Sequence, residues 1–260
     1  ESCTISSNTA SHGGGIYING STTVTMESCN ITDNTANWSG GDDANGGGIY
    51  IEGSATTLIM TSCAVSSNTA SKNGGGFYSK FATVIMTSCT ITSNDAEEWG
   101  GGFFISSSVA TVTMRSCAIV GNTAIDKGGG FFISNSVILT MESCLVSSNT
   151  ALRGGGLYIT SRSATVNLVG CKFFSNSASI SDADIYHPSA STINFYSLCP
   201  RGSFYAGTGS LDCTTCDVPK DLSGTSSCIT CPASTPFSCC GATSCSASES
   251  ICTATELEIC

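Results

Sequence analysis

A single cassette recurs through most of this chain and limits what the chain can fold into. It reads Cys-x-(Ile/Val)-x-x-Asn-x-Ala, then a short variable stretch, then Gly-Gly-Gly-(Ile/Phe/Leu)-(Tyr/Phe). Successive copies start 26, 34, 26, 28, 27 and 27 residues apart. A nearly fixed period in this range is typical of solenoids, in which each repeat buries its apolar face only against its neighbours. We therefore predict a repeat architecture.

Each repeat contains three stretches with the pattern of a short β-strand. The first, such as Thr83-Val84-Ile85-Met86, alternates outward and inward side chains, the second is Cys-x-(Ile/Val), and the third follows the glycines. Three strands per repeat, stacked in parallel, predict an all-β, right-handed parallel β-helix of about seven coils. A leucine-rich repeat does not fit, because its Leu-x-x-Leu-x-Leu pattern is absent.

The repeat pattern fails after Phe195, so we divide the chain into a β-helix over residues 1–198 and a cysteine-rich module over residues 199–260. Ten of the 17 cysteines fall in this module, which indicates an oxidising, extracellular compartment. Disulfides are the favoured state, with a zinc ribbon at the pairs Cys213/Cys216 and Cys228/Cys231 as the alternative. The disulfide candidates are Cys199, Cys213, Cys216, Cys228, Cys231, Cys239, Cys240, Cys245, Cys252 and Cys260.

The charge balance excludes several classes of partner. The net charge is −10 and only nine Lys and Arg are present, which argues against nucleic acid and against anionic membrane surfaces. No run of about 18 apolar residues is present, so we expect no direct membrane insertion. Because the chain starts inside a repeat, we expect it to be part of a longer secreted or surface polypeptide.

One asparagine follows the second strand in every copy. We predict a structural role, because asparagine tolerates the left-handed conformation of a sharp corner and stacked amides can form a ladder. None of these residues has Ser or Thr two positions later, so none is a glycosylation sequon. The predicted ladder contains Asn8, Asn34, Asn68, Asn94, Asn122, Asn149 and Asn176.

The cysteines and glycines of the cassette also have a structural interpretation. We predict that the cysteines form an internal column of reduced thiols, because stacked side chains run parallel and seven is an odd number; disulfides between neighbours are the alternative. The glycines are predicted to allow tight turns and close approach of coils rather than to bind phosphate. The cysteine column contains Cys3, Cys29, Cys63, Cys89, Cys117, Cys144 and Cys171.

Aromatic residues occupy one outward position in every coil. One interpretation is stacking that stabilises the sheet, with cover from flanking loops. The other is a flat stripe that binds a polysaccharide or a neighbouring protomer. The stripe contains Tyr17, Tyr50, Tyr78, Phe104, Phe132, Tyr158 and Tyr186.

Other outward features suggest weaker candidate sites. The Thr-x-(Thr/Ile/Asn) face resembles the ice-binding surface of solenoid antifreeze proteins, although Ile and Asn interrupt it. The variable corners carry acidic residues that are candidates for Ca²⁺ binding, with a solvated acidic corner as the alternative: Asp42, Asp43, Glu97 and Glu98. Three asparagines lie in glycosylation sequons and are expected to be exposed: Asn19, Asn30 and Asn37.

Catalysis is not expected. In the coils, no column carries two or three carboxylates at neighbouring outward positions, as a polysaccharide lyase or hydrolase needs. Asp182, Asp184 and His187 lie close together in sequence, but in a degenerate last coil that we expect to end the rod. His12 is a corner residue with no evident partner.

The rod resembles the polymorphic outer-membrane-protein repeats of chlamydiae, which alternate Phe-x-x-Asn with Gly-Gly-Ala-(Ile/Leu/Val). Phe173-Phe174-Ser175-Asn176 matches the first motif outright, whereas the other coils carry Ile or Val, and the third small residue is Gly. This resemblance implies a pectin-lyase-like β-helix, surface exposure and adhesion.

The tail resembles ephrin-receptor-like or EGF-like modules, through Cys199-Pro-Arg-Gly-Ser-Phe-Tyr205 and Cys213-x-x-Cys216. The combination of rod and tail looks like large extracellular proteins of protists and algae, including components of flagellar hairs (mastigonemes).

Together these features predict a non-catalytic, extracellular structural or adhesive protein. Its rod is expected to assemble into or decorate a surface fibre, coat or flagellar hair, through self-association or through other extracellular structural proteins. The alternatives are a carbohydrate-binding β-helix or polysaccharide lyase that uses the aromatic stripe, and an ice-binding solenoid.

Overall fold

The computed structural model describes residues 2–37, 44–107, 110–188 and 191–196. It also gives the backbone of four short strands in the tail, β29 (Ser203–Tyr205), β30 (Cys213–Thr215), β31 (Lys220–Ser223) and β32 (Ser227–Thr230). These strands form two antiparallel pairs, β29 with β30 and β31 with β32. The side chains of the ten cysteines after residue 198 lie outside the described residues, so their predicted disulfides remain a prediction.

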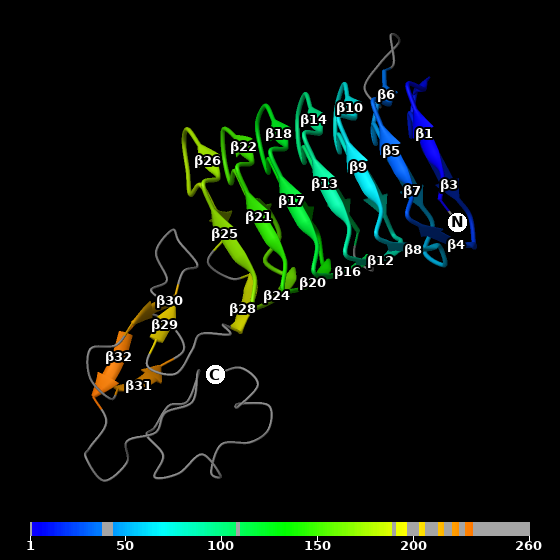
Figure 1. The fold of residues 1–260 in the computed structure, drawn as a ribbon. Helices are drawn as coiled ribbons and strands as arrows, with labels where there is room; N and C mark the ends of the chain where they lie inside the picture. The colour runs from blue at the N-terminus through cyan, green and yellow to red at the C-terminus, as the bar shows by residue number, and fades with distance from the viewer. Residues whose placement is uncertain are drawn as a thin grey trace.

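The rod is a right-handed parallel β-helix of about seven coils, and the strands of successive coils stack side by side along it (Figure 1). Each coil contributes one strand to each of four seven-stranded sheets, here named A to D in the order in which the chain enters them. Within the described residues, no helix is long and apolar enough to cross a membrane.

Sheet A follows each cassette cysteine. Its strands are β1 (Thr4–Ser6), β5 (Asn30–Thr32), β9 (Ala64–Ser66), β13 (Thr90–Thr92), β17 (Ala118–Val120), β21 (Leu145–Ser147) and β25 (Lys172–Phe174). Sheet B follows each ladder asparagine. Its strands are β2 (Thr9–Ala10), β6 (Thr35–Ala36), β10 (Thr69–Ala70), β14 (Asp95–Ala96), β18 (Thr123–Ala124), β22 (Thr150–Ala151) and β26 (Ser177–Ala178).

Sheet C follows the glycine triplets. Its strands are β3 (Ile16–Asn19), β7 (Ile49–Glu52), β11 (Phe77–Lys80), β15 (Phe103–Ser106), β19 (Phe131–Ser134), β23 (Leu157–Ile159) and β27 (Ile185–Tyr186). Sheet D ends each coil. Its strands are β4 (Thr23–Glu27), β8 (Thr57–Thr61), β12 (Thr83–Thr87), β16 (Thr111–Arg115), β20 (Ile138–Glu142), β24 (Thr165–Val169) and β28 (Thr192–Tyr196).

The prediction of three strands per coil was wrong by one strand. Sheet B is built from strands of only two residues, Thr-Ala in most coils, and two residues are too few to show an alternating pattern. The register of the cassette is otherwise maintained between coils: Thr83 pairs with Thr57 and with Thr111. The longer second repeat places its extra residues between β6 and β7, so it leaves the stacking of the strands unchanged.

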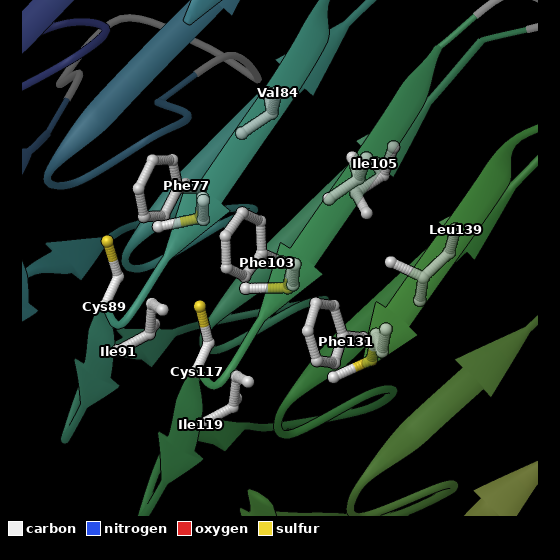
Figure 2. Packing of buried hydrophobic residues seen from close by; sticks show 14 of the residues in the cluster. Phe77, Val84, Cys89, Ile91, Phe103, Ile105, Cys117, Ile119, Phe131 and Leu139 are labelled. Carbon is white, nitrogen blue, oxygen red and sulfur yellow. The ribbon is translucent and has the colours of Figure 1, made fainter. Parts of the chain in front are cut away.

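The core is a series of stacked columns of identical or similar side chains (Figure 2). Phe77, Phe103 and Phe131 stack face to face, with ring centroids 4.3 and 5.1 Å apart. Burial of such a ring contributes about 1.5–3 kcal/mol, so a repeated column accumulates stability coil by coil. Ser79 interrupts the neighbouring isoleucine column, and its buried hydroxyl has no hydrogen-bond partner.

The corners correct one detail of the predicted ladder. The asparagines do not adopt the left-handed conformation; the residue before each of them does, as Ser93 does with φ of 54°. The residue before most column cysteines is also left-handed. Serine fills most of these positions, although a residue with a β-carbon adopts the left-handed conformation only at a cost in strain. The asparagine instead keeps a conformation that points its side chain inward.

The glycine triplets behave as predicted. Gly100, the first of its triplet, has φ of 69° and makes the turn. A β-carbon on Gly101 would lie 2.3 Å from the carbonyl oxygen of Thr123, and one on Gly102 would lie 2.7 Å from that of Gly130. The triplet is therefore required for adjacent coils to approach.

Candidate functional site: the stacked columns of the rod

The asparagine column forms the predicted ladder of hydrogen bonds. The backbone N–H and the side-chain Nδ2 of Asn68 both donate to Oδ1 of Asn94, at 3.0 and 2.9 Å. Nδ2 of Asn94 donates in turn to Oδ1 of Asn122 at 2.9 Å and to the backbone carbonyl of Val65 at 3.0 Å. The inner asparagine amides are thus used by the fold and are not presented to a ligand.

The last coil closes this ladder. The glycine triplet is missing there, and Asp184, only 8% exposed, accepts a hydrogen bond of 2.8 Å from Nδ2 of Asn176. His187 lies on the surface, where its Nδ1 is 3.4 Å from the hydroxyl of Ser191. Asp184 therefore ends the ladder in this coil, whereas the end of the rod stays a prediction.

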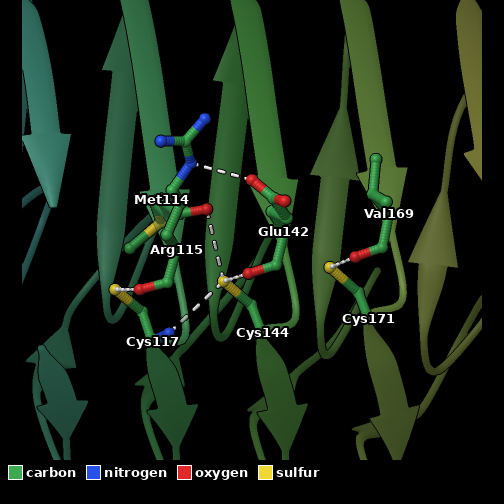
Figure 3. Close-up of polar contacts among 7 residues, drawn as sticks. All are labelled: Met114, Arg115, Cys117, Glu142, Cys144, Val169 and Cys171. Carbon is green, nitrogen blue, oxygen red and sulfur yellow. Dashed lines mark hydrogen bonds and ion pairs between the residues drawn. The ribbon is translucent and has the colours of Figure 1, made fainter. Parts of the chain in front are cut away.

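The cysteine column is reduced and mostly buried. None of the seven rod cysteines is disulfide-bonded; five are buried, whereas Cys3 is exposed and Cys171 is half-buried. The thiol of Cys117 donates to the carbonyl oxygen of Arg115 at 3.2 Å, and that of Cys144 donates to Glu142 at 3.3 Å (Figure 3). The sulfur of Cys144 also accepts the backbone N–H of Cys117 at 3.4 Å (Figure 3). The thiols therefore hold the corners of the coils.

The aromatic column is a continuous stack of parallel rings. Ring centroids of neighbours lie 4.5–5.7 Å apart, from Tyr17 to Tyr186. Of the two interpretations, an exposed stripe does not fit most of the column: Tyr17 is 49% exposed, but Phe132 is only 3% exposed. The column lies outside sheet C as alternation predicted, so its burial must come from a second layer.

That second layer comes from the variable corner before the glycine triplets. Trp99 stacks on Phe132 with ring centroids 5.1 Å apart, and Lys127 lies 5.1 Å from the centre of the Trp99 ring and 5.8 Å from that of Tyr158. Single bridges between Asn73, Trp99, Lys127 and Arg153 align these corners in parallel. The interpretation in which flanking loops cover the stack is the one that the geometry supports.

Asp126 holds this covering layer together. It accepts hydrogen bonds from Trp99 Nε1 at 3.2 Å and Arg153 at 2.7 Å, and it pairs with Lys127 at 2.9 Å. Partial burial opposes its ionisation, but the hydrogen bonds from Lys127 and Trp99 hold the pKa of Asp126 below its usual value. No repeated motif marks this network in the sequence, because its members come from three different coils at positions where the cassette varies.

A second polar group lies at the exposed end of the aromatic stack. The hydroxyl of Tyr50 donates to Glu52 at 3.0 Å, and Lys80 pairs with the same carboxylate at 2.9 Å. Burial, followed by the charge of neighbouring tyrosines, raises the pKa of Tyr50 far above its usual value, whereas the hydrogen bond from Lys80 lowers that of Glu52. His12, which the sequence left without a partner, stacks on Tyr50 with ring centroids 5.1 Å apart.

The outer face of sheet D is open but irregular. Ile85 and Ile138 are exposed among its threonines, and Arg115 pairs with Glu142 at 2.8 Å. Asn194 donates to Asn167 at 2.8 Å, so part of the face bonds to itself. The interruptions expected from the sequence are therefore present on the surface that was considered for ice binding.

The remaining candidate sites are outward-facing. Asn19, Asn30 and Asn37 are all exposed. Within the described residues, no three His, Cys, Asp or Glu side chains are grouped to hold a metal ion. Of the candidate calcium ligands, Glu97 is exposed and Glu98 half-buried, whereas Asp42 and Asp43 lie outside the described residues.

Comparison with known proteins agrees with this geometry. Residues 42–193, more than half of the chain, match the family described as right handed beta helix region. Residues 2–19, which contain β1 to β3, match the Chlamydia polymorphic membrane protein repeat. No curated protein and no solved structure matches the chain. The β-helix and its likeness to polymorphic membrane protein repeats are confirmed, whereas the ephrin-receptor-like or EGF-like tail stays a prediction.

Proposed function

Because this chain belongs to the right-handed β-helix family, we propose that it is a non-catalytic scaffold that is displayed at a cell surface and acts in adhesion or in surface assembly. The match to the Chlamydia polymorphic membrane protein repeat supports a surface-exposed location. The finer form of the proposal is that the rod assembles into, or decorates, a fibre, coat or flagellar hair at that surface.

The observation that carries this proposal is how the repeated polar and aromatic residues are used. The ladder asparagines bond to one another, the thiols bond to corner carbonyls, and the rings of Phe104, Phe132 and Tyr158 lie against Trp99 or Lys127. Apart from the exposed Tyr17, the positions left for recognition are mainly variable ones, and these differ from coil to coil. Such a rod can present different binding residues along its length, which is typical of solenoids in adhesion and assembly.

The test is an assembly and adhesion assay on the full chain. We expect beads coated with the protein to bind to cells or to one another, and electron microscopy to show rods in filaments or in lateral arrays. Beads coated with a heat-denatured sample are the control. A monodisperse monomer, with no filaments and no bead retention above the control, would count against both adhesion and assembly.

Glycan binding is a second candidate, restricted by the burial of the stripe to its exposed end. Tyr17 is the most exposed ring of the stack in the described part, and Asn19 lies beside it, with Nδ2 3.5 Å from the Tyr17 hydroxyl. A tyrosine face with a neighbouring amide suits a sugar ring. Binding on a glycan array should be lost with Tyr17→Ala and kept with Phe174→Ala, an exposed aromatic on sheet A.

A further inference from the structure

The five inner cysteines of the rod share one environment. Each is at most 2% exposed, and each thiol donates to the carbonyl oxygen two residues earlier, at 3.2–3.4 Å. The left-handed residue lies between donor and acceptor, so the thiol spans the corner that this residue makes. The set is Cys29, Cys63, Cys89, Cys117 and Cys144.

We propose that the rod is selective in its redox chemistry: closure of the coils keeps these five thiols reduced in an oxidising compartment, and oxidation before closure prevents the rod from forming. The backbone spacing alone would not achieve this. Stacked residues lie about 4.8 Å apart, which is inside the Cα range of a disulfide. Selectivity has to come from the side chains.

The side chains supply two barriers. The Cys117 thiol is directed at the carbonyl of Arg115, and the Cys144 thiol lies 3.3 Å from the carbonyl of Glu142 and 3.6 Å from that of Met114 (Figure 3). A bond between the two sulfurs would remove both S–H donors, so the carbonyls of Arg115 and Glu142 would keep only the backbone N–H groups of Ser88 and Ser116. The buried position also excludes the oxidant, because a small disulfide must reach the sulfur for a thiolate to attack it.

Ionisation adds to this protection. The neighbouring Cys144 thiol, followed by burial, raises the pKa of Cys117 to about 11. A thiol shifted from its usual value by about two units has about 100-fold less thiolate at neutral pH. Cys171 differs: it is half-buried, and the neighbouring Cys144 thiol lowers its pKa. The column therefore has a protected interior and a reactive end.

The chemistry in the open chain is ordinary thiol–disulfide exchange. A cysteine thiolate attacks oxidised glutathione, a protein–glutathione disulfide forms, and one glutathione thiolate leaves. A second cysteine thiolate attacks the protein sulfur of this bond, which closes a protein disulfide and releases the second glutathione. In the unfolded chain nothing protects the seven rod cysteines, so any pair that forms cannot then occupy the stacked column.

The first test is differential alkylation of the full native chain. The protein is treated with light iodoacetamide, then denatured and treated with an isotopically heavy form, and each rod peptide is weighed by mass spectrometry. We expect light label on Cys171 and heavy label on the buried inner five, with Cys117 labelled at a rate at least about 100-fold lower than that of Cys171. The proposal is overturned if the inner cysteines take light label as fast as Cys171, or take neither label because they are disulfide-bonded.

The second test asks whether the folded rod, rather than the intrinsic chemistry of its cysteines, prevents their oxidation. Native protein and urea-unfolded protein are both placed in oxidised glutathione, the urea is then removed, and the rod peptides alone are mapped, so that the tail cysteines do not enter the readout. We expect the native sample to keep its five reduced thiols and its β-sheet circular dichroism. The unfolded sample should acquire disulfides among the rod cysteines and fail to regain the β-sheet signal. Equal oxidation of the two samples, or full recovery of the oxidised one, contradicts the proposal.

Discussion

Replacement of Asn94 by alanine removes one rung from the middle of the asparagine ladder. The wild-type side chain takes part in four hydrogen bonds: two accepted from Asn68, and one donated to each of Val65 and Asn122. Asn94 is 1% exposed, so water does not replace these bonds. Asn122 Oδ1 keeps the backbone N–H of Asn94, but the other three partners lose a bond.

The cost follows from the groups that are left without a partner. The groups left without a partner are the backbone N–H of Asn68 and one N–H of its side-chain amide, whereas the carbonyl of Val65 loses one donor but lies in the parallel ladder of β9 and β13. An unsatisfied buried group costs about 1–3 kcal/mol, so two such groups predict a loss of about 2–6 kcal/mol in the free energy of unfolding. Since domains are stable by about 5–15 kcal/mol, this single change brings the rod close to unfolding.

The assay is urea denaturation followed by circular dichroism, with Asn8→Ala as the matched control. Asn8 holds the same position in the first coil, but it is exposed and its side chain donates one ladder bond, at 2.9 Å. We expect the control to lose at most about 1 kcal/mol. Because coils contact only their neighbours, native-state hydrogen exchange should also speed up most in coils next to Asn94. The reasoning is refuted if the two variants lose stability equally.

Three further substitutions test other parts of the rod. Ser79→Ala removes a buried hydroxyl without a partner, so we expect a gain of about 1 kcal/mol in a thermal or urea melt, and a loss would mean that the hydroxyl is satisfied. Glu52→Gln breaks the pair with Lys80, whose hydrogen bond depresses the pKa of the Glu52 carboxyl. Because the pKa of Glu52 is lower in the folded protein, the ion pair stabilises the fold at pH values above the unfolded pKa near 4.3, and this stabilisation is lost as the pH falls through the folded pKa. Wild type and Glu52→Gln should therefore differ in stability by at most about 1 kcal/mol at pH 7 and converge in acid. Gly101→Ala forces a β-carbon to within 2.3 Å of the Thr123 carbonyl, and soluble expression should fall sharply. It should fall further than for Gly20→Ala, whose β-carbon meets open space so that only the backbone strain at a φ of 100° opposes the change.

The cassette made the ladder predictable but not the conformation of its corner. An asparagine at the same place in every coil indicates a stacked amide, and the hydrogen bonds agree. The left-handed residue is Ser93 rather than Asn94, because a side chain that must point inward to the next amide cannot also turn the chain. The serine that precedes the asparagine adopts the strained left-handed conformation instead. Which neighbour makes the turn depends on where the amide has to point, and residue preference alone does not contain this information.

Alternation likewise predicted the side of the sheet on which Phe132 lies, but not its burial. A period of two assigns a side chain to one face of a strand. Whether that face is open depends on what packs over it, and here the cover is Trp99 from the preceding coil and Lys127 from the corner before Phe132. Their positions vary between coils, so no repeat marks them as a layer. The fourth strand was missed for a related reason, because a pair of residues shows no period.

Recognition by this rod therefore has to come from the residues that the coils do not share. Directly after sheet B, Ile125 and Leu152 are exposed in successive coils, where the earlier coils carry Ser11, Asn37, Ser71 and Glu97; in the next coil the exposed Ile180 lies one position later. Each of these side chains can change without touching the ladder, the thiols or the aromatic stack. Because stability in a solenoid is set by contacts between neighbouring coils, a surface residue can be substituted to suit a binding partner while the packing of the coils stays the same. A repeat that fixes its interior this strictly can thus carry a different surface in every coil, which is what adhesion along a rod requires.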